Sequence, residues 1–229
     1  MYGYYMDPTY VLVIIGFVFT LIARFGVNST FRRYSNVRNS YGLTGAQAAR
    51  RILDANGLRH VQIAHISGNL TDNFNPRTNI VSLSDSTFNS SSVAAVGVAA
   101  HECGHAIQYA KGYAPIKIRN SIVPVVNIGN ALSMPIFLIG LLLGMGGLAM
   151  FGAVLFGLVL VFQLVTLPVE FNASRRALKT LDGMNLLDDK ELKGAKKVLK
   201  AAAMTYVAAA ASTLLQFMRL LMLANRRRD

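Results

Sequence analysis

An uncharged tract in the second half of the chain constrains the fold more than any other feature of the sequence. The 50 residues from Asn120 through Val169 include no Asp, Glu, Lys or Arg. A helix that crosses a lipid bilayer needs about 20 apolar residues, so this tract is long enough for two crossings. A glycine-rich stretch at 144–147 supplies a turn between them. We therefore expect a helical hairpin in the membrane, formed by residues 122–143 and 148–169.

The composition and the N-terminal segment fit the same environment. Hydrophobic residues make up 53% of the chain and charged residues 15%, whereas soluble domains average roughly 45–50% and 25%. A second apolar run, Thr9–Ala23, lies between Asp7 and Arg24 and predicts a further membrane helix. Tyrosines suited to the bilayer interface surround its start: Tyr2, Tyr4, Tyr5 and Tyr10. The expected fold class is mainly α, a multi-pass membrane protein.

The placement of the basic residues predicts how the chain is oriented in the membrane. The formal net charge is +12, and basic residues gather after the first membrane helix, before the second and after the third. The positive-inside rule places these flanks in the cytoplasm, so the N-terminus and the glycine-rich turn lie outside. The flanks also favour anionic lipid headgroups. We expect no nucleic-acid partner, because no basic face carries interleaved aromatic residues.

Residues 201–224 form another apolar stretch that is long enough to cross the bilayer. The stretch ends in Arg226-Arg-Arg228, and a crossing would place these charges outside the cell, against the positive-inside rule. We therefore expect a helix that packs beside the hairpin at the cytoplasmic face.

Residues 25–120 are expected to form a small α+β region on the cytoplasmic side. A capping-box pattern at Thr44 starts a helix that Gly57 ends. Alternating apolar residues predict two short strands, and a loop rich in Gly, Asn and Pro at 67–79 separates them. The two strands are Val61–Ile66 and Ile80–Leu83.

A later helix of this region carries the pattern His101-Glu-Cys-Gly-His105. We expect the helix to start after the serines at 90–92, to end near Lys111, and to be buried because it is apolar on nearly all faces. Residues four apart lie about 40° apart around a helix, so both imidazoles can bind one Zn²⁺ ion. Without a metal ion, burying these polar side chains would be costly.

Glu102 lies between the two histidines in sequence and about 60° from His105 around the helix. It can therefore reach a water molecule beside the ion without being a ligand. As a catalytic base it would take a proton from the water that attacks a peptide carbonyl, and return it to the leaving amine. Cys103 lies about 200° from His101, so we expect it to pack in the core. A single cysteine permits no internal disulfide and fits a reducing compartment.

A catalytic zinc site usually has three protein ligands, so one must come from outside this helix. His60 and His65 lie on or near the first strand. Glu170 is the first charge after the uncharged tract, and we favour it as a ligand over an ordinary interfacial carboxylate. Asn172 or Ser174 is expected to support a ligating histidine from behind, and Arg175 to steady an oxyanion. Arg175 is equally well explained as part of the basic flank.

These motifs resemble the YugP-like family of bacterial membrane neutral zinc metallopeptidases over nearly the whole chain. The matching stretches are Gly42-Leu-Thr-Gly-Ala, residues 48–57, Leu70-Thr-Asp, Asn75-Pro-Arg77, residues 93–108, Gly112-Tyr-Ala-Pro115 and residues 167–178. The resemblance implies a gluzincin-type site with His101, His105 and Glu170 as zinc ligands and Glu102 as base. The spacing from Glu170 to Ser174 is similar to the Glu-x-x-x-Asp of related HtpX and prenyl-protein proteases.

The chain departs from the family pattern at a few polar positions. The family loop usually reads Asp-His-Tyr-Asp-Pro, where this chain has Asp72-Asn-Phe-Asn-Pro76. The later Glu-Phe-Asp is here Glu170-Phe-Asn172. The metal triad is intact, but the altered loop weakly favours an alternative, a zinc-binding membrane scaffold or pseudo-protease without turnover. A small transporter is disfavoured, because the hairpin has few polar residues.

We expect a zinc metalloendopeptidase that hydrolyses peptides or membrane proteins at the cytoplasmic face of the cell membrane. An extended substrate can add to the edge of a strand beside the metal helix, and plain sheet packing is the alternative. Candidate substrate-strand residues are Val61 and Ile63 on the first strand and Ile80 and Leu83 on the second. The expected regions are 1–24 (membrane helix), 25–120 (metallopeptidase region), 121–169 (membrane hairpin) and 170–229 (cytoplasmic or membrane-associated helices with the third ligand).

Overall fold

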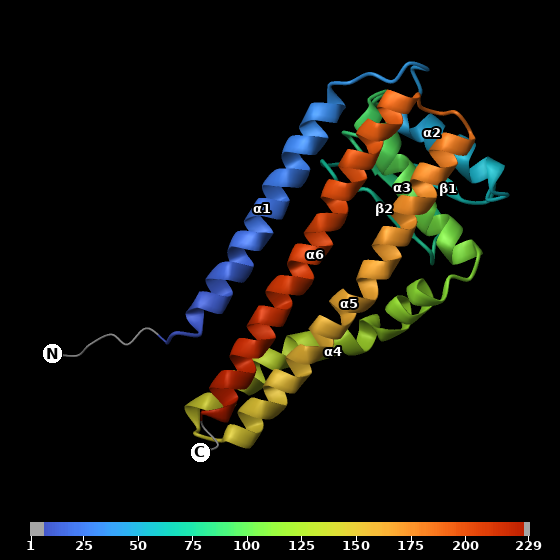
Figure 1. Ribbon diagram of the computed structural model, residues 1–229. Helices are drawn as coiled ribbons and strands as arrows, with labels where there is room; N and C mark the ends of the chain where they lie inside the picture. The colour runs from blue at the N-terminus through green and yellow to red at the C-terminus, as the bar shows by residue number, and fades with distance from the viewer. Residues whose placement is uncertain (1–6, 227–229) are drawn as a thin grey trace. The chain divides into compact units, whose positions relative to one another are not determined.

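The computed structural model describes residues 7–226, which form six α-helices and three β-strands (Figure 1). The helices are α1 (Tyr10–Ser35), α2 (Gly45–Ala55), α3 (Val93–Ala110), α4 (Ala114–Leu142), α5 (Gly146–Gly183) and α6 (Asp189–Asn225). The strands are β1 (Gln62–Ile66), β2 (Asn73–Asn75) and β3 (Ile80–Ser84). The mainly α fold class is confirmed, and α1, α4, α5 and α6 are long and apolar enough to cross a bilayer.

The chain divides into two compact units, each built from segments that are distant in sequence. The membrane-helix unit contains the described residues of Met1–Arg24, Ile118–Leu167 and Thr205–Asp229. The site unit contains Phe25–Lys117 and Pro168–Met204. Three of the expected interfacial tyrosines, Tyr2, Tyr4 and Tyr5, lie outside the described residues.

Glycines bring α4 and α5 close together in the membrane-helix unit. A Cβ atom at Gly140 would lie 2.3 Å from the backbone nitrogen of Ala149, and one at Gly152 would lie 2.5 Å from that of Phe137. Gly144, with a φ of +69°, makes the turn between the helices. Side chains on their outer faces are apolar and more than half exposed: Val125, Ile128, Phe151 and Val154. The predicted hairpin is thus a closely packed pair with a lipid-compatible surface.

α6 packs along α1 in the opposite direction within this unit (Figure 1). A Cβ atom at Gly16 of α1 would lie 2.8 Å from the hydroxyl oxygen of Ser212 of α6. Closer to the end of α6, the Arg219 guanidinium stacks on the Tyr10 ring, with its carbon 4.2 Å from the ring centroid. The α6 helix therefore follows α1 through its apolar part as a fourth candidate membrane span.

The expectation that residues 201–224 lie at the cytoplasmic face stays a prediction, and the apolar length of α6 favours a crossing as the alternative. The arginine cluster at the end of the helix, Arg226-Arg-Arg228, disfavours a crossing by the positive-inside rule. In the structure Arg226 forms an ion pair with Asp7, at 3.2 Å, beside the start of α1. Arg227 and Arg228 lie outside the described residues.

The site unit has a hydrophobic core between α2, α3 and the sheet. Fully buried side chains at its centre include Ile52, Leu53, Val81, Leu83 and Val96. The predicted capping box starts α2, because the Thr44 hydroxyl accepts the Gln47 N–H and the Gln47 side chain accepts the Thr44 N–H. Ser92 caps α3 by accepting the Ala95 N–H. These local signals fix where the two core helices begin.

β3 is the central strand of the sheet, parallel to β1 and antiparallel to β2. β2 lies within the stretch expected to be a loop, where Asn73 and Asn75 have low strand propensity. Because β3 is bonded on both sides and Leu83 is fully buried, Ile80 and Leu83 have no edge to offer a substrate. That part of the substrate-strand expectation is wrong, and the free edges belong to β1 and β2.

Candidate metal centre

The histidines of the His-Glu-x-x-His pattern lie one turn apart on α3. Their ring centroids are 4.7 Å apart and the ring planes meet at 85°. Both side chains are mostly buried. The α3 helix passes through the core of the site unit, so its position is set by packing on both sides of the pattern. The spacing read from the sequence therefore gives the expected geometry, with two imidazoles directed to one point.

Glu170 reaches this point from α5. Its Oε2 atom lies 3.3 Å from Nε2 of His101 and 3.6 Å from Nε2 of His105. The ligand atoms of the three residues lie within 4.8 Å of one another, and they form the one such cluster in the described part of the chain. Neither His60 nor His65 belongs to it. Two imidazole nitrogens and one carboxylate oxygen are a ligand set known from catalytic zinc sites.

α3 and α5 come close enough for this contact because Gly104 has no side chain. A Cβ atom there would lie 2.6 Å from the backbone oxygen of Ala173 on α5. Ala173 is three residues after Glu170, on the same helix. Gly104, the variable position of the pattern directly before His105, thus has a steric role. It lets the two helix backbones touch at the level of the ligands.

The helix that carries Glu170 is continuous through a proline. The expectation was that a membrane helix ends at Val169 and that a new helix starts at Glu170. Instead α5 runs from Gly146 to Gly183 with Pro168 inside it. Proline lacks an N–H, so the usual hydrogen bond to the carbonyl of Leu164 is missing two residues before Glu170.

Hydrogen bonds determine which nitrogen of His105 faces the cluster. The Gln108 amide nitrogen donates to the backbone oxygen of Val169 at 2.8 Å and to Asn172 Oδ1 at 3.0 Å. This fixes the amide, so that its Oε1 atom accepts from Nδ1 of His105 at 3.0 Å. The proton of the neutral ring is therefore on Nδ1, and the Nε2 lone pair is directed toward Glu170.

A contact with the Ser174 hydroxyl similarly holds the ring of His101. The Ser174 hydroxyl lies 3.2 Å from Nδ1 of His101, one turn of α5 after Glu170. Asn172 and Ser174 thus lie where the sequence placed them. Arg175 is exposed and makes no polar contact with a described residue, so its role stays a prediction. Its neighbour Arg176 donates to Asn172 Oδ1 at 2.7 Å instead.

Gln108 is the supporting residue that sequence reasoning missed. It is fully buried. It lies three residues after His105, and this spacing puts both side chains on one face of α3. A buried glutamine in the turn that follows a metal-binding histidine was the available signal. The Asn172 amide oxygen accepts from Gln108 and Arg176 as a carboxylate oxygen would, so the departure from Asp at this position preserves both contacts.

Glu102 lies beside the cluster but not in it. The side chain is 8% exposed and its carboxylate makes no hydrogen bond with any described residue. Burial raises its pKa above the usual value, although His101 and His105 partly offset this effect. Its oxygen atoms are not among the fully buried unpartnered atoms of the described residues, so a water molecule can reach them. Water and a cation at the neighbouring cluster would satisfy it, so the residues present fit a metal site.

Comparison with known proteins agrees with this geometry. A family model described as "putative neutral zinc metallopeptidase" matches residues 9–225. The chain belongs to this family of zinc metallopeptidases. It is also 44% identical over 207 residues to a protein described as "putative membrane protease YugP" from Bacillus subtilis (strain 168), with 90% of the chain and 92% of that protein covered. No solved structure matches the chain closely enough for comparison.

Family membership confirms the resemblance drawn from the motifs and identifies zinc as the cofactor. His101, His105 and Glu170 are close enough to hold it. The four apolar helices and the membrane protease relative both indicate a membrane-associated zinc metallopeptidase. Cys103 is not part of the site, as expected. It is fully buried, which raises its pKa, and its Sγ lies 3.6 Å from the backbone oxygen of Ala49.

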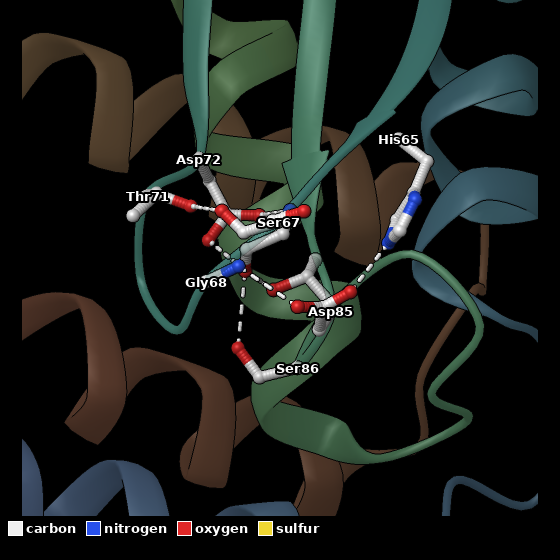
Figure 2. Close-up of polar contacts among 9 residues, drawn as sticks. His65, Ser67, Gly68, Thr71, Asp72, Asp85 and Ser86 are labelled. Carbon is white, nitrogen blue, oxygen red and sulfur yellow. Dashed lines mark hydrogen bonds and ion pairs between the residues drawn. The ribbon is translucent and has the colours of Figure 1, made fainter.

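The loop between β1 and β2 is fixed by two aspartates (Figure 2). Asp72 accepts the backbone N–H and the hydroxyl of Ser84, both at 2.8 Å. Asp85 accepts the Gly68 N–H at 2.8 Å and contacts Nε2 of His65 at 2.7 Å. His65, one of the alternatives for the third ligand, is therefore held at the sheet. Asp72 leads directly into β2 and sets where that edge strand begins.

Replacing Ser174 should weaken zinc binding without unfolding the protein. In Ser174→Ala the His101 ring loses the contact that orients it, and losses of supporting contacts typically cost about 10–100-fold in metal affinity. Competition with a chromophoric chelator measures the zinc affinity. Ser174→Asp should retain tight binding, because a carboxylate accepts the same Nδ1 proton. Equal affinity of Ser174→Ala and wild type would show that the hydroxyl does not position the ring.

Proposed function

We propose that this protein is a zinc-dependent endopeptidase of the cell membrane that hydrolyses peptide bonds on the cytoplasmic side. The observation that supports this most is the convergence of His101, His105 and Glu170, with Glu102 buried beside them. A structural zinc site is usually closed by four protein ligands. Three ligands and an adjacent unpaired carboxylate are what a hydrolytic site needs.

Glu102 is the general base of the proposed reaction. When bound, zinc lowers the pKa of a water molecule and polarises the carbonyl of the peptide bond. Glu102 accepts the proton of the attacking water and passes it to the nitrogen of the leaving amine. Its carboxylate is available for both steps because no described residue donates a hydrogen bond to it. Ser174 and Gln108 keep the two rings in place throughout.

The substrate is an extended segment of a peptide or a membrane protein, and we place it along the free edge of β2. β2 is the edge strand that lies against α3, whereas β1 lies against α2. Phe74 of β2 contacts Tyr109 of α3, with ring centroids 6.4 Å apart. Backbone hydrogen bonds to such an edge bind a peptide whatever its sequence. Val61 and Ile63 were also expected to contact the substrate. They lie on or next to β1, at the edge of the sheet opposite β2, so a substrate on β2 does not reach them.

The cytoplasmic location of the site is supported by charge. The site unit contains most of the basic residues that follow the first membrane helix, precede the second and follow the third; Arg24 and Arg119 lie in the other unit. With four membrane crossings, the two ends of the chain lie on the same side of the membrane. The positive-inside rule then places these flanks, and the histidines between them in sequence, in the cytoplasm.

A cleavage assay with Glu102→Gln tests the proposed function. Removing a general base lowers kcat/KM by about 10²–10⁴-fold, so the variant should cleave casein and liposome-reconstituted membrane proteins far more slowly than wild type. Its zinc content should be unchanged, because Glu102 is not a ligand. If wild type and variant cleave equally fast, the proposal is wrong. If zinc-loaded wild type cleaves none of these substrates, the zinc-binding scaffold becomes the better description.

A further inference from the structure

A groove lined by cations lies between α1 and α6 in the site unit. Its volume is about 320 Å³. Arg33 of α1 and Lys197 and Lys200 of α6 line it, and all three are exposed. No acidic side chain lines the groove. None of the three cations forms an ion pair with a residue that the structure describes. The groove therefore concentrates positive charge without any internal compensation.

The floor of the groove is built by close packing of the two helices. Tyr34 lies against α6 where Gly194 has no side chain, since a Cβ atom there would be 2.7 Å from the ring. The Arg33 guanidinium carbon is 5.8 Å from the centroid of the same ring. Thr30 adds a hydroxyl to the lining and Met204 an apolar end. Cations, a hydroxyl and an apolar border meet in one concave site.

Both walls of the groove lead into apolar helix surface. On α1, Phe25 is 71% exposed and lies eight residues before Arg33, about 12 Å along the helix axis. On α6, Met204 is 45% exposed and follows Lys200 by four residues, about 6 Å. Both helices are candidate membrane spans. Basic side chains placed just beyond the exposed apolar part of a membrane helix reach the lipid headgroups.

We propose that Arg33, Lys197 and Lys200 bind the phosphate headgroup of an anionic phospholipid. The acyl chains then lie along the apolar surface that starts at Phe25 and Met204. A free phosphate ion would use only the cations, whereas a lipid also covers these exposed apolar side chains. The choice of lipid over phosphate follows from that combination. The lipid site does not depend on the peptidase reaction, since no zinc ligand lines the groove.

The same two helices supply a matched control for this proposal. Arg32, Lys193 and Lys196 are also exposed cations on α1 and α6, but they do not line the groove. We compare the full-length triple variant Arg33→Gln, Lys197→Gln, Lys200→Gln with the triple variant Arg32→Gln, Lys193→Gln, Lys196→Gln. Both lose three positive charges. Circular dichroism and thermal unfolding check that each variant folds like wild type.

Native mass spectrometry of the detergent-purified protein measures the bound lipid. The protein is mixed with equal amounts of dioleoyl phosphatidylglycerol and dioleoyl phosphatidylcholine. Wild type and the control variant should retain one phosphatidylglycerol in preference to phosphatidylcholine. The groove variant should lose that preference by on the order of tenfold or more, because three charge-assisted contacts to one phosphate are removed.

Two results would overturn the proposal. Equal loss of phosphatidylglycerol from both triple variants would mean that diffuse surface charge attracts the lipid. Displacement of the lipid by a matched concentration of glycerol phosphate would mean that the groove binds a soluble phosphate. A further variant, Thr30→Phe, fills the groove without changing the charge and should also abolish retention. It provides the same test if the triple groove variant does not fold.

Discussion

Glu170→Ala should leave the purified protein without zinc and without peptidase activity. The variant removes one of three ligands, so the loss of affinity should exceed the 10–100-fold typical of supporting residues. It also leaves His101 and His105 without the carboxylate that lies 3.3 and 3.6 Å from their Nε2 atoms. Metal analysis of detergent-purified protein, followed by titration with zinc, measures both stoichiometry and affinity.

A second buried glutamate in the site unit controls for damage to the fold. Glu191 is 7% exposed and caps the start of α6, where it accepts hydrogen bonds from Ser40 and from the Asp188 N–H. Glu191→Ala should cost about 0.5–2 kcal/mol of unfolding free energy, as lost helix caps do. It should still bind zinc as wild type does. Unchanged zinc stoichiometry and affinity in Glu170→Ala would exclude Glu170 as a ligand.

A single methyl group at Gly104 should disrupt the metal centre almost as severely. In Gly104→Ala the new Cβ atom would lie 2.6 Å from the backbone oxygen of Ala173, and backbone atoms cannot move away as a flexible side chain can. The α3 and α5 helices must separate, which draws Glu170 away from the histidines. We expect a lower melting temperature and zinc affinity reduced by at least the factor expected for Ser174→Ala.

Gly97→Ala is the matched control on the same helix. There the new Cβ atom would lie 3.3 Å from the Cβ atom of Ala195 on α6, a contact that a small shift relieves. Alanine also has a higher helix propensity than glycine, by about 1 kcal/mol. This variant should therefore unfold near the wild-type temperature and bind zinc normally. If Gly104→Ala behaved in the same way, the close approach of α3 and α5 would not be needed for the site.

The parts of the site that the sequence predicts well depend on local geometry. His101, Glu102 and His105 lie on one helix, and their relative placement follows from helical periodicity alone. Glu170 lies on another helix. The sequence identified it for a different reason, because it is the first charge after a long uncharged tract. Gln108 needed knowledge of how α3 and α5 meet, because its contacts to Val169 and Asn172 join residues more than 60 positions apart.

The sequence also failed to predict parts of the fold that depend on contacts between residues distant in sequence. β2 was missed because its asparagines resemble a loop, and it becomes a strand through pairing with β3. The contact between the end of α6 and the start of α1 was not accessible from the sequence, because a count of charges does not include the partner of Arg226. That partner, Asp7, lies 219 residues away in sequence. Local patterns predicted the helix starts correctly, at Thr44 for α2 and at Ser92 for α3.

The proline inside α5 has a mechanical consequence for the enzyme. Pro168 interrupts the hydrogen-bond ladder between the apolar stretch of α5 and the turn that carries Glu170. Beyond it, the helix is clamped locally, by the Gln108 amide on the oxygen of Val169 and by Gly104 against Ala173. Pro168 is therefore the position where α5 bends most easily, immediately before the contacts that hold the turn of Glu170.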